Sequence, residues 1–403
     1  MKQYTKYLLF VLLLLLLLLA SINWLINPFA IFDAPLIHGF NVFKRPVEGH
    51  ERMSKAYQVK NLMPDYIILG SSRALAIPDD YLVPDDMTGF NLALASSSTY
   101  EQVRMFQHAH AVRKQKRVVI GLDERLTTGV MQAFSEERLV VDAEGSQRSS
   151  WAGGVFQDVL TVLLSLDALR ASIKTVTQQP DGSIENYLQQ EKIKRVKNAG
   201  GHRQMFHNME ASVLRKFRNI TTESCYQVSD DAENENRDAQ SYLRKMIETA
   251  YADDIDFNIF FSPVHARYYE AWCLGGSWRG IEDMKRNVVV MVEEAASKYG
   301  KRPFPVWDFS GYNIITMEPV PVLGDKETLM RGYWEGSHYT ETVSRLILQR
   351  MFGDDSAVPD DFGVLLNSDN IDMHLNGIHE QHRLYVASNP GLIEELISLV
   401  SER

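Results

Sequence analysis

The sequence has few cysteines, no excess of positive charge and no internal repeat. Only 2 of its 403 residues are Cys, and 42 Lys and Arg stand against 52 Asp and Glu, which gives a formal net charge of -10. A protein that binds phosphate backbones normally carries the opposite sign, so nucleic-acid binding is disfavoured. The hydrophobic share of 45% is ordinary for a folded protein and excludes wholesale disorder. The length allows two or three domains, or one elaborated α/β domain.

Cys225 and Cys273 belong to no CxxC motif and to no Cys/His pair with ligand spacing. A structural zinc site is therefore disfavoured. In an oxidising compartment, an even number of cysteines is compatible with one disulfide, and the alternative is two unpaired residues in the core. The sequence leaves both open.

One long apolar run stands at the N-terminus. Leu8–Ala20 is unbroken and mostly leucine, and Tyr7–Ile26 has roughly the 20 residues that cross a bilayer as a helix. Lys2 and Lys6 precede it, which predicts that the N-terminus stays in the cytoplasm and the rest of the chain lies outside. We therefore expect residues 1–28 to form a single-pass anchor in the inner (cytoplasmic) membrane, with a periplasmic domain.

A cleaved signal peptide and a buried soluble helix are the alternatives for this segment. No clear A-x-A cleavage site follows Ala20, and Trp24 has the place of an interfacial anchor. Both observations favour an uncleaved membrane span.

Four short apolar runs bounded by turn residues predict buried strands. They are Tyr66–Gly70, Arg117–Gly121, Phe257–Phe261 and Pro305–Phe309. Between the first two, apolar residues recur at helical spacing over Tyr100–Lys114. Buried strands that alternate with helices predict an α/β fold with a parallel sheet, in which ligand chemistry lies at the carboxyl ends of the strands.

The predicted organisation has a connector, one α/β domain with an insertion, and a C-terminal extension. Residues 29–60 form the connector, residues 61–126 and 253–352 the α/β domain, residues 127–252 a helical insertion, and residues 353–403 the extension. A lid, a partner-docking surface and a second domain all stay open as roles of the insertion.

The first predicted strand ends in Gly70-Ser71-Ser72-Arg73. A serine on a tight turn at the carboxyl end of a strand can be an exposed nucleophile with backbone N–H groups nearby. The structural alternative for the same serine is a helix N-cap.

The second cluster is Glu335-Gly336-Ser337-His338, which precedes an apolar helix predicted at Val343–Phe352. A carboxylate three residues before a histidine can orient the imidazole, and an oriented imidazole can deprotonate a serine hydroxyl. Taken singly, Glu335 could equally be a charge at a helix N-terminus, and His338 a packed surface histidine.

Together these clusters resemble the SGNH/GDSL hydrolase superfamily, whose first motif is Gly-Asp-Ser and whose last is Asp-x-x-His. Residues 91–97 match the position of the second family motif, and residues 121–123 that of the third. The resemblance implies a three-layer α/β/α, flavodoxin-like fold. It also implies Ser72 as nucleophile, His338 as general base and Glu335 as its orienting carboxylate.

The sequence departs from the family motifs at four positions. Ser71 replaces the Asp of the first motif, Glu335 replaces the Asp of the last, and Ser96 stands where a glycine N–H lines the oxyanion hole. Asp123 stands where an Asn normally donates a side-chain hydrogen bond to the oxyanion, and an ionised carboxylate cannot donate one. Three outcomes follow: a protonated Asp123, a takeover of its role by Arg73 or another group, or reduced catalysis. Arg73 and Asp123 could equally form a structural ion pair.

Two further residues are predicted to line a substrate pocket. His265 follows the third predicted strand, and Trp334 lies beside the Glu335–His338 loop. Aromatic faces with polar neighbours suit sugar rings. For both residues, core packing or loop capping is the structural alternative.

The resemblance implies a membrane-anchored serine esterase or O-acyltransferase that forms an acyl-enzyme and needs no metal and no organic cofactor. Membrane-tethered proteins of this kind, such as those that acetylate alginate, modify exported polysaccharide, so the expected substrate is a glycan or another acylated small molecule. The alternative is a catalytically degenerate scaffold that binds glycan or partner proteins in an envelope assembly. Asp123 and the long insertion favour the scaffold, whereas Ser72 and the Glu335-x-x-His338 pair favour the enzyme.

Overall fold

The computed structural model describes residues 2–148, 152–217, 220, 225, 232–353 and 355–401. The chain folds into two compact units. The first consists of Met1–Met63, Gln107–Lys114 and Met131–Glu191, and the second of Pro64–Phe106, Gln115–Val130 and Lys192–Arg403. Residues 127–252, expected as one helical insertion, are thus divided between the two units.

The first unit is helical. Its elements are α1 (Lys2–Ile26), α2 (Glu51–Leu62), α4 (Ala152–Leu164) and α5 (Leu166–Thr177), with short 3₁₀ turns η1 (Arg45–Val47) and η3 (Glu136–Arg138). A small core holds them together, formed by Phe29, Ile31, Tyr57, Val162 and Ala168.

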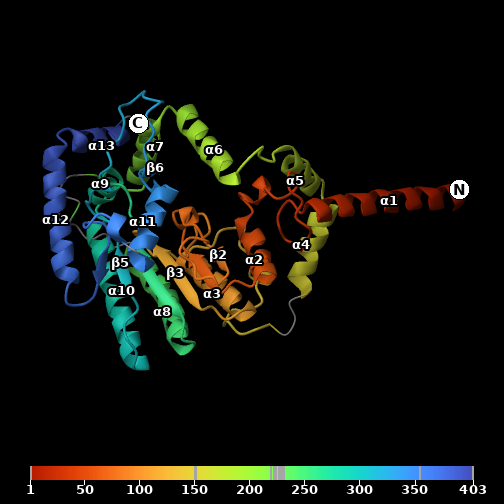
Figure 1. Cartoon of the computed structure of the whole chain (residues 1–403), viewed down its shortest axis with the longest axis horizontal. Coiled ribbons are helices and arrows are strands. Elements are labelled where there is room, and N and C mark those ends of the chain that lie inside the picture. Colours follow the sequence, from red (N-terminus) through yellow and green to blue (C-terminus); the bar gives the residue numbers. More distant parts are fainter. Residues whose placement is uncertain are drawn as a thin grey trace. The chain divides into compact units, whose positions relative to one another are not determined.

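Among the described residues, one helix is long and apolar enough to cross a membrane, over Gln3–Ile26. This agrees with the span predicted from the sequence. The leucines of Leu8–Leu18 are exposed, whereas Asn23 and Ile26 are buried. Figure 1 shows α1 projecting away from α4 and α5 over most of its length. Only the last turns of α1 therefore pack against protein, and the rest of its apolar surface is exposed.

The second unit contains a six-stranded sheet with the order β2-β1-β3-β4-β5-β8. The strands are β1 (Tyr66–Leu69), β2 (Gly89–Asn91), β3 (Arg117–Leu122), β4 (Asp256–Phe261), β5 (Val306–Asp308) and β8 (Val364–Leu366). Neighbours from β2 to β5 pair in parallel, whereas β8 pairs antiparallel with β5. The predicted α/β class is confirmed as a mixed, mostly parallel sheet, to which the segment after residue 352 adds the antiparallel edge.

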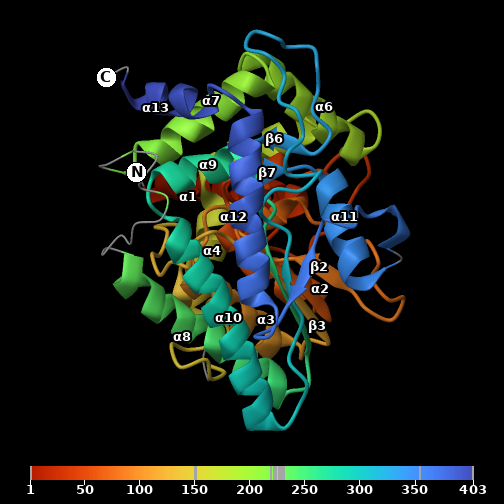
Figure 2. The same cartoon turned by 90° about the vertical axis from the view of Figure 1, so that its left-hand side faces the viewer.

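Helices cover both faces of this sheet. On one face, Ile68, Val119 and Phe260 share a core with residues of α11. On the other face, the ring of Phe257 meets that of Phe106 in α3 at 6.5 Å between centroids. Figures 1 and 2 show two further helices, α8 and α10, packed side by side. The strands are consequently buried on both sides, which explains why they read as continuous apolar runs.

The other helices complete the chain. They are α3 (Thr99–Val112), α6 (Ile184–Asn198), α7 (His202–Leu214), α8 (Ala232–Ala252), α9 (Ala266–Leu274), α10 (Trp278–Tyr299), α11 (Glu341–Phe352), α12 (Ile371–Ser388) and α13 (Leu392–Ser401), with the 3₁₀ turns η2 (Ala74–Ala76) and η5 (Asp355–Ala357). Helices α3 and α6 each begin in one unit and end in the other.

A small antiparallel hairpin precedes α11. It pairs β6 (Tyr333–Glu335) with β7 (His338–Tyr339), and it places Glu335 opposite His338. The sequence predicted this segment only as a loop before a helix. The hairpin turns the local Glu-x-x-His pattern into a fixed pair of facing side chains.

Candidate active site

The turn that carries Ser72 begins with a glycine that no other residue could replace without strain. Gly70 has a φ of +145°, in the region that favours glycine. A Cβ atom there would lie 2.7 Å from the Cβ of Ala74 and 3.0 Å from the carbonyl oxygen of Gly121. After this turn Ser71 is buried and its Oγ accepts a hydrogen bond from the Arg73 N–H at 3.4 Å, whereas Ser72 is only half-buried.

Ser72 meets His338 across 266 positions of sequence. The distance between Ser72 Oγ and His338 Nε2 is 2.8 Å. Ser72 stands at the carboxyl end of β1 and His338 at the start of β7, so the contact depends on tertiary structure alone. The predicted pair of nucleophile and general base depends on this contact.

Glu335 completes the row of groups. Its Oε1 is hydrogen-bonded to His338 Nδ1, and its Oε2 accepts the Ser337 N–H at 2.9 Å. Burial works against ionisation of Glu335, but the hydrogen bond and charge of His338 and the hydrogen bonds from Ser337 outweigh it, so the pKa of Glu335 lies below its ordinary value. An ionised Glu335 keeps the proton on His338 Nδ1, which leaves the Nε2 lone pair facing Ser72.

The turn of the hairpin is fixed on the first turn of α9. The main-chain N–H of His265 donates to the carbonyl of Gly336 at 2.9 Å. A Cβ atom at Gly336 would lie 2.9 Å from the Cβ of Tyr268, so the turn lies directly on the helix. Glycine therefore permits the close approach that holds Glu335 and His338 in place.

Two polar residues that no sequence motif indicated, Glu318 and His202, hold the chain that leads into β6. Glu318 accepts the N–H groups of Arg331 and Gly332 at 2.7 and 2.8 Å. His202 donates from Nδ1 to the Trp334 carbonyl at 3.1 Å and accepts the Met330 N–H on Nε2 at 3.2 Å. Burial lowers the pKa of His202, which keeps it in this neutral form. Neither residue stands in a local motif that could have revealed its partners.

His265 serves the framework instead of the substrate. Its side chain is 1% exposed, Nε2 donates to the carbonyl of Glu318 at 2.8 Å, and Nδ1 accepts the Arg267 N–H at 3.2 Å. Burial lowers the pKa of His265 to about 4, and the charges of Arg267 and Arg203 act in the same direction. Both ring nitrogens thus form hydrogen bonds inside the protein, and His265 is the N-cap of α9. This is the structural alternative and not the predicted substrate contact.

Arg73 and Asp123 form an ion pair beside Ser72. Arg73 Nη1 lies 3.2 Å from Asp123 Oδ1 and 2.9 Å from Glu124 Oε1, and Nη2 donates to Tyr268 Oη at 3.5 Å. Burial opposes the charge of Arg73, but the two carboxylates outweigh it and hold the pKa of Arg73 well above its ordinary value. Arg73 is therefore a permanent buried cation between two carboxylates, of which Asp123 is the more exposed.

Ser96 lies in a loop held close to the Ser72 turn. Ser97 Oγ donates to the Gly70 carbonyl at 2.9 Å, and Asn91 Nδ2 donates to the carbonyls of Ala74 and Ile77, both at 2.8 Å. Ser96 itself is exposed and has a φ of +54°, a conformation that glycine favours. Its backbone thus has the geometry expected where the family motif has glycine.

Trp334 packs away from the Glu335 side of its strand. Successive side chains of a strand point to opposite faces, so Tyr333 and Glu335 share one face and Trp334 takes the other. The Trp334 ring lies over that of His202 at 6.4 Å between centroids, and Lys192 Nζ lies 5.5 Å from its centre. The structure therefore places Trp334 next to α6 and α7, and a substrate contact for it stays a prediction.

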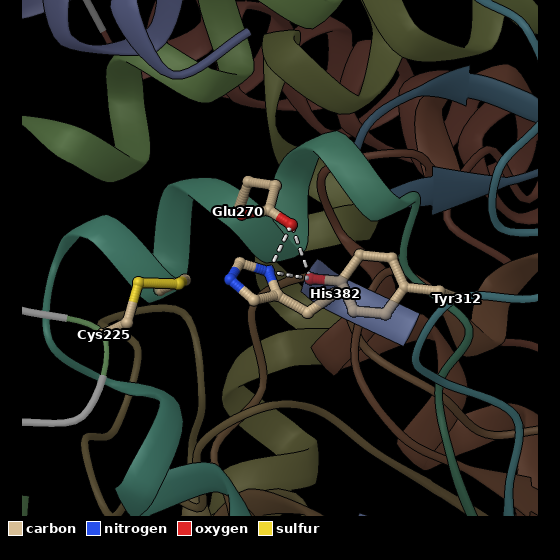
Figure 3. The surroundings of a disulfide bond; sticks show 5 residues. Cys225, Glu270, Tyr312 and His382 are labelled. Carbon is tan, nitrogen blue, oxygen red and sulfur yellow. Dashed lines mark hydrogen bonds and ion pairs between the residues drawn. A yellow bond between two sulfur atoms is a disulfide. The ribbon is translucent and has the colours of Figure 1, made fainter. Parts of the chain in front are cut away.

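A second polar cluster lies beside a disulfide between Cys225 and Cys273 (Figure 3). Glu270 Oε1 accepts hydrogen bonds from Tyr312 Oη at 2.6 Å and from His382 Nδ1 at 2.9 Å, and these side chains point toward one another. Atoms of Glu270, Cys273 and His382 lie within 4.8 Å of one another. Because the Cys273 sulfur is in the disulfide and the Glu270 oxygen already has two donors, this donor set is a hydrogen-bonded network and not a prepared metal site.

Comparison with known proteins identified no family for this chain. No protein-family model matches the chain, and no curated protein matches it significantly.

Proposed function

We propose that this chain is a membrane-anchored, extracytoplasmic serine esterase or O-acyltransferase of SGNH type. The observation that carries the proposal is the continuous row from Ser72 Oγ through the His338 ring to the Glu335 carboxylate. The arrangement has a nucleophile, a base within hydrogen-bond reach of it and an orienting acid behind the base, on an α/β sheet at a strand's carboxyl end. The half-buried position of Ser72 leaves it accessible to substrate.

The proposed reaction has two steps. Ser72 Oγ attacks the carbonyl carbon of an ester while its proton passes to His338 Nε2, and the collapse of the tetrahedral intermediate releases an alcohol that takes this proton. The acyl group then stays on Ser72 as an ester. In the second step His338 removes a proton from water or from an acceptor hydroxyl, and the oxygen of that group attacks the acyl carbon. The tetrahedral intermediate collapses by breaking the bond between the acyl carbon and Ser72 Oγ, and His338 returns the proton to Ser72 Oγ. Water gives hydrolysis, and a sugar hydroxyl gives transfer.

The oxyanion would be stabilised by backbone donors. We assign this role to the N–H groups of Ser72 and Ser96, which follow the first and second strands on adjacent loops. Asp123 is paired with Arg73 and offers the oxyanion no proton. The positive charge of Arg73 weakens the repulsion between the Asp123 carboxylate and the oxyanion. We therefore expect catalysis at a reduced rate.

The proposed location is the cytoplasmic membrane, with α1 as the anchor and the rest of the chain outside the cytoplasm. Lys2 and Lys6 before the apolar run support this orientation, and a disulfide between Cys225 and Cys273 is typical of an oxidising compartment. The proposed substrate is an acylated exported or cell-envelope glycan, a class that rests on the resemblance to membrane-tethered members of the superfamily.

Covalent labelling with a fluorophosphonate tests the nucleophile. We expect the full-length protein in detergent to be labelled, Ser72→Ala to abolish labelling, and Ser71→Ala to leave it in place, because Ser71 is buried and does not face His338. Release of p-nitrophenol from p-nitrophenyl acetate should follow the same order. Equal labelling of wild type and Ser72→Ala would contradict the assignment, and no labelling across the pH range would favour the degenerate scaffold.

A further inference from the structure

The membrane contact of this protein extends beyond its N-terminal helix. We propose that α4, the start of α5 and the loop at Leu36–Ile37 form an interfacial membrane-binding surface around the end of α1 at Ile26. The inference rests on the proposed membrane span of α1. It assigns to the first unit a lipid-contacting function that neither the anchor nor the candidate active site explains.

The outer face of α4 is exposed, carries no charged residue and contains an apolar stripe. Phe156, Leu160 and Leu164 follow one another at intervals of four residues, so they form a stripe along the helix. Their exposed fractions are 64%, 39% and 41%. Leu166, at the start of α5, is 63% exposed, and the exposed ion pair of Asp167 and Arg170 follows it. A helix on a water-facing surface normally presents charged side chains there, and α4 presents none.

The one charged residue of α4 lies on its inner face. Asp158 is the only charged residue of the helix, and it points into the unit, where it accepts hydrogen bonds from Tyr57 Oη at 2.8 Å and from Arg138 Nε at 2.7 Å. Val162 on the same side is buried in the core. Helix α4 is therefore packed on its inner side and uncharged on its outer side, where an apolar stripe lies beside the exposed Gln157 and Thr161. This is compatible with a helix between protein and the membrane interface.

Asn23 fixes this helix at the level where α1 leaves the bilayer. It lies three residues before the end of α1, and its Nδ2 donates to the carbonyl of Leu163 at 3.0 Å. Its Oδ1 accepts from Ser172 Oγ of α5 at 3.0 Å. Figure 1 shows α4 running across the direction of α1, at the edge of the first unit from which α1 projects. A helix across the axis of a membrane span lies along the plane of the bilayer.

The loop after α1 adds a second apolar element at the same level. Leu36 and Ile37 are 66% and 43% exposed. Asn41 ties this loop to the end of the anchor, since its Nδ2 donates to the Leu25 carbonyl at 2.9 Å and its Oδ1 accepts the Ile37 N–H at 2.7 Å. Trp24, 44% exposed, occupies the position that aromatic residues prefer at a membrane interface.

Lipid is the occupant that these observations favour. The stripe on α4, the Leu36–Ile37 loop and Trp24 are all joined to the last turn of one membrane-spanning helix, so a bilayer that covers α1 reaches them without any further partner. Helix α4 and the Leu36–Ile37 loop are both attached to the last turn of α1, so both can contact the same planar membrane interface.

Depth-dependent quenching in vesicles tests this surface. The full-length protein, with its native disulfide intact, receives one added cysteine labelled with an environment-sensitive nitrobenzoxadiazole, through Leu160→Cys, Leu13→Cys or Gln189→Cys. Gln189 lies in α6 within the same unit and is exposed. The protein is reconstituted into phosphatidylcholine and phosphatidylglycerol vesicles whose lipids carry a spin label just below the headgroups or at the bilayer centre.

We expect the label at position 160 to emit at shorter wavelength than the label at position 189 and to be quenched most by the shallow spin label. The label at position 13 should be quenched most by the deep one. An aqueous label at 160 with a quenched label at 13 would overturn the interfacial surface and leave the anchor standing. A blue-shifted label at 160 that no spin-labelled lipid quenches would show that protein covers the stripe, and would overturn it too. An aqueous label at 13 would overturn the anchor and this inference together.

Discussion

Asp123 is the residue at which the candidate site differs most from the family it resembles. It stands beside a buried Arg73 that also pairs with Glu124, so one cation is shared between two carboxylates. This surplus of negative charge lies beside the turn of Ser72, where an oxyanion would form on the carbonyl oxygen of the substrate. If the site is catalytic, its rate is limited here, because a missing oxyanion donor costs on the order of 10²–10³ in rate.

Asp123→Asn should therefore raise the rate of ester hydrolysis. An Asn side chain supplies the N–H donor that the carboxylate lacks and keeps an oxygen to accept from Arg73. We expect kcat for p-nitrophenyl acetate to rise by about tenfold or more, up to roughly the 10²-fold that one donor contributes. The measurement is steady-state turnover of the full-length protein in detergent.

Glu124→Gln is the matched control for this substitution. It removes the same charge from the same ion cluster, but from a buried carboxylate that has no place in the family's oxyanion motif. Its kcat should stay at or below that of wild type. An equal rise in both variants would mean that charge alone matters, and an unchanged rate in a folded Asp123→Asn protein would argue against an oxyanion at this position.

Ser72, His338 and Glu335 could be predicted as site residues because each belongs to a short local pattern. Ser72 follows a strand and a glycine, and Glu335 and His338 share one turn, while the meeting of the two clusters follows from the way parallel strands bring their ends to one edge. His265 could not be assigned in this way. Its burial results from rings that pack against it from distant parts of the chain, those of Phe206 and Tyr333.

At the scale of elements, the N-terminus of α9 carries the hairpin of the candidate site. His265 caps the helix through Nδ1, holds Glu318 through Nε2, and anchors the hairpin turn through its main-chain N–H. Only the neutral ring can accept the Arg267 N–H on Nδ1. Protonation of His265 would therefore remove the cap of α9, the helix on which the hairpin turn packs.

The folded state should lose stability as the pH falls from about 6.5 to about 4. His265 has its ordinary value of 6.5 when the chain is unfolded and a pKa of about 4 when folded, so between these values the unfolded chain binds more protons. Its contribution is fully present above pH 6.5 and lost below pH 4, and a difference of this size corresponds to about 3 kcal/mol. His265→Asn keeps a cap acceptor without a titrating ring.

We expect His265→Asn to show a flatter loss of unfolding free energy between pH 7 and pH 4.5 than wild type. Urea unfolding of the full-length protein in detergent at several pH values measures this directly. His38→Asn serves as control, because His38 is exposed and its profile should match wild type. Parallel profiles for wild type and His265→Asn would show that other groups govern the acid sensitivity.

The elements that sequence predicted are those with a strong local pattern. The four apolar runs correspond to β1, β3, β4 and β5, and the segment with helical spacing after Tyr100 corresponds to α3. The strands β2 and β8 were not predicted: like β5 they have three residues each, but neither belongs to the four apolar runs bounded by turn residues. Strand β8 joins the edge in the opposite direction, because its pairing with β5 is decided by tertiary packing. The apolar outer face of α4 was read only as part of a helical insertion.

At the scale of the whole molecule, the disulfide links two distant segments of the second unit. Cys225 and Cys273 are separated by 48 positions, and both are buried, Cys273 near the end of α9. The sequence left the pairing open because two cysteines carry no spacing rule at this separation. The bond closes a loop that includes all of α8 and β4, so it restricts the unfolded chain over a large part of the sheet domain.

Replacing both cysteines by alanine should therefore lower the free energy of unfolding by about 4 kcal/mol, the loop-closure value for a separation of this length. Urea unfolding of the oxidised full-length protein and of the Cys225→Ala/Cys273→Ala protein measures the difference. A thiol reductant should shift wild type toward the double variant and leave the variant unchanged, which separates loss of the bond from other effects of the reductant. A loss below about 1 kcal/mol would contradict the loop-closure value and would mean that the unfolded chain already holds these segments together.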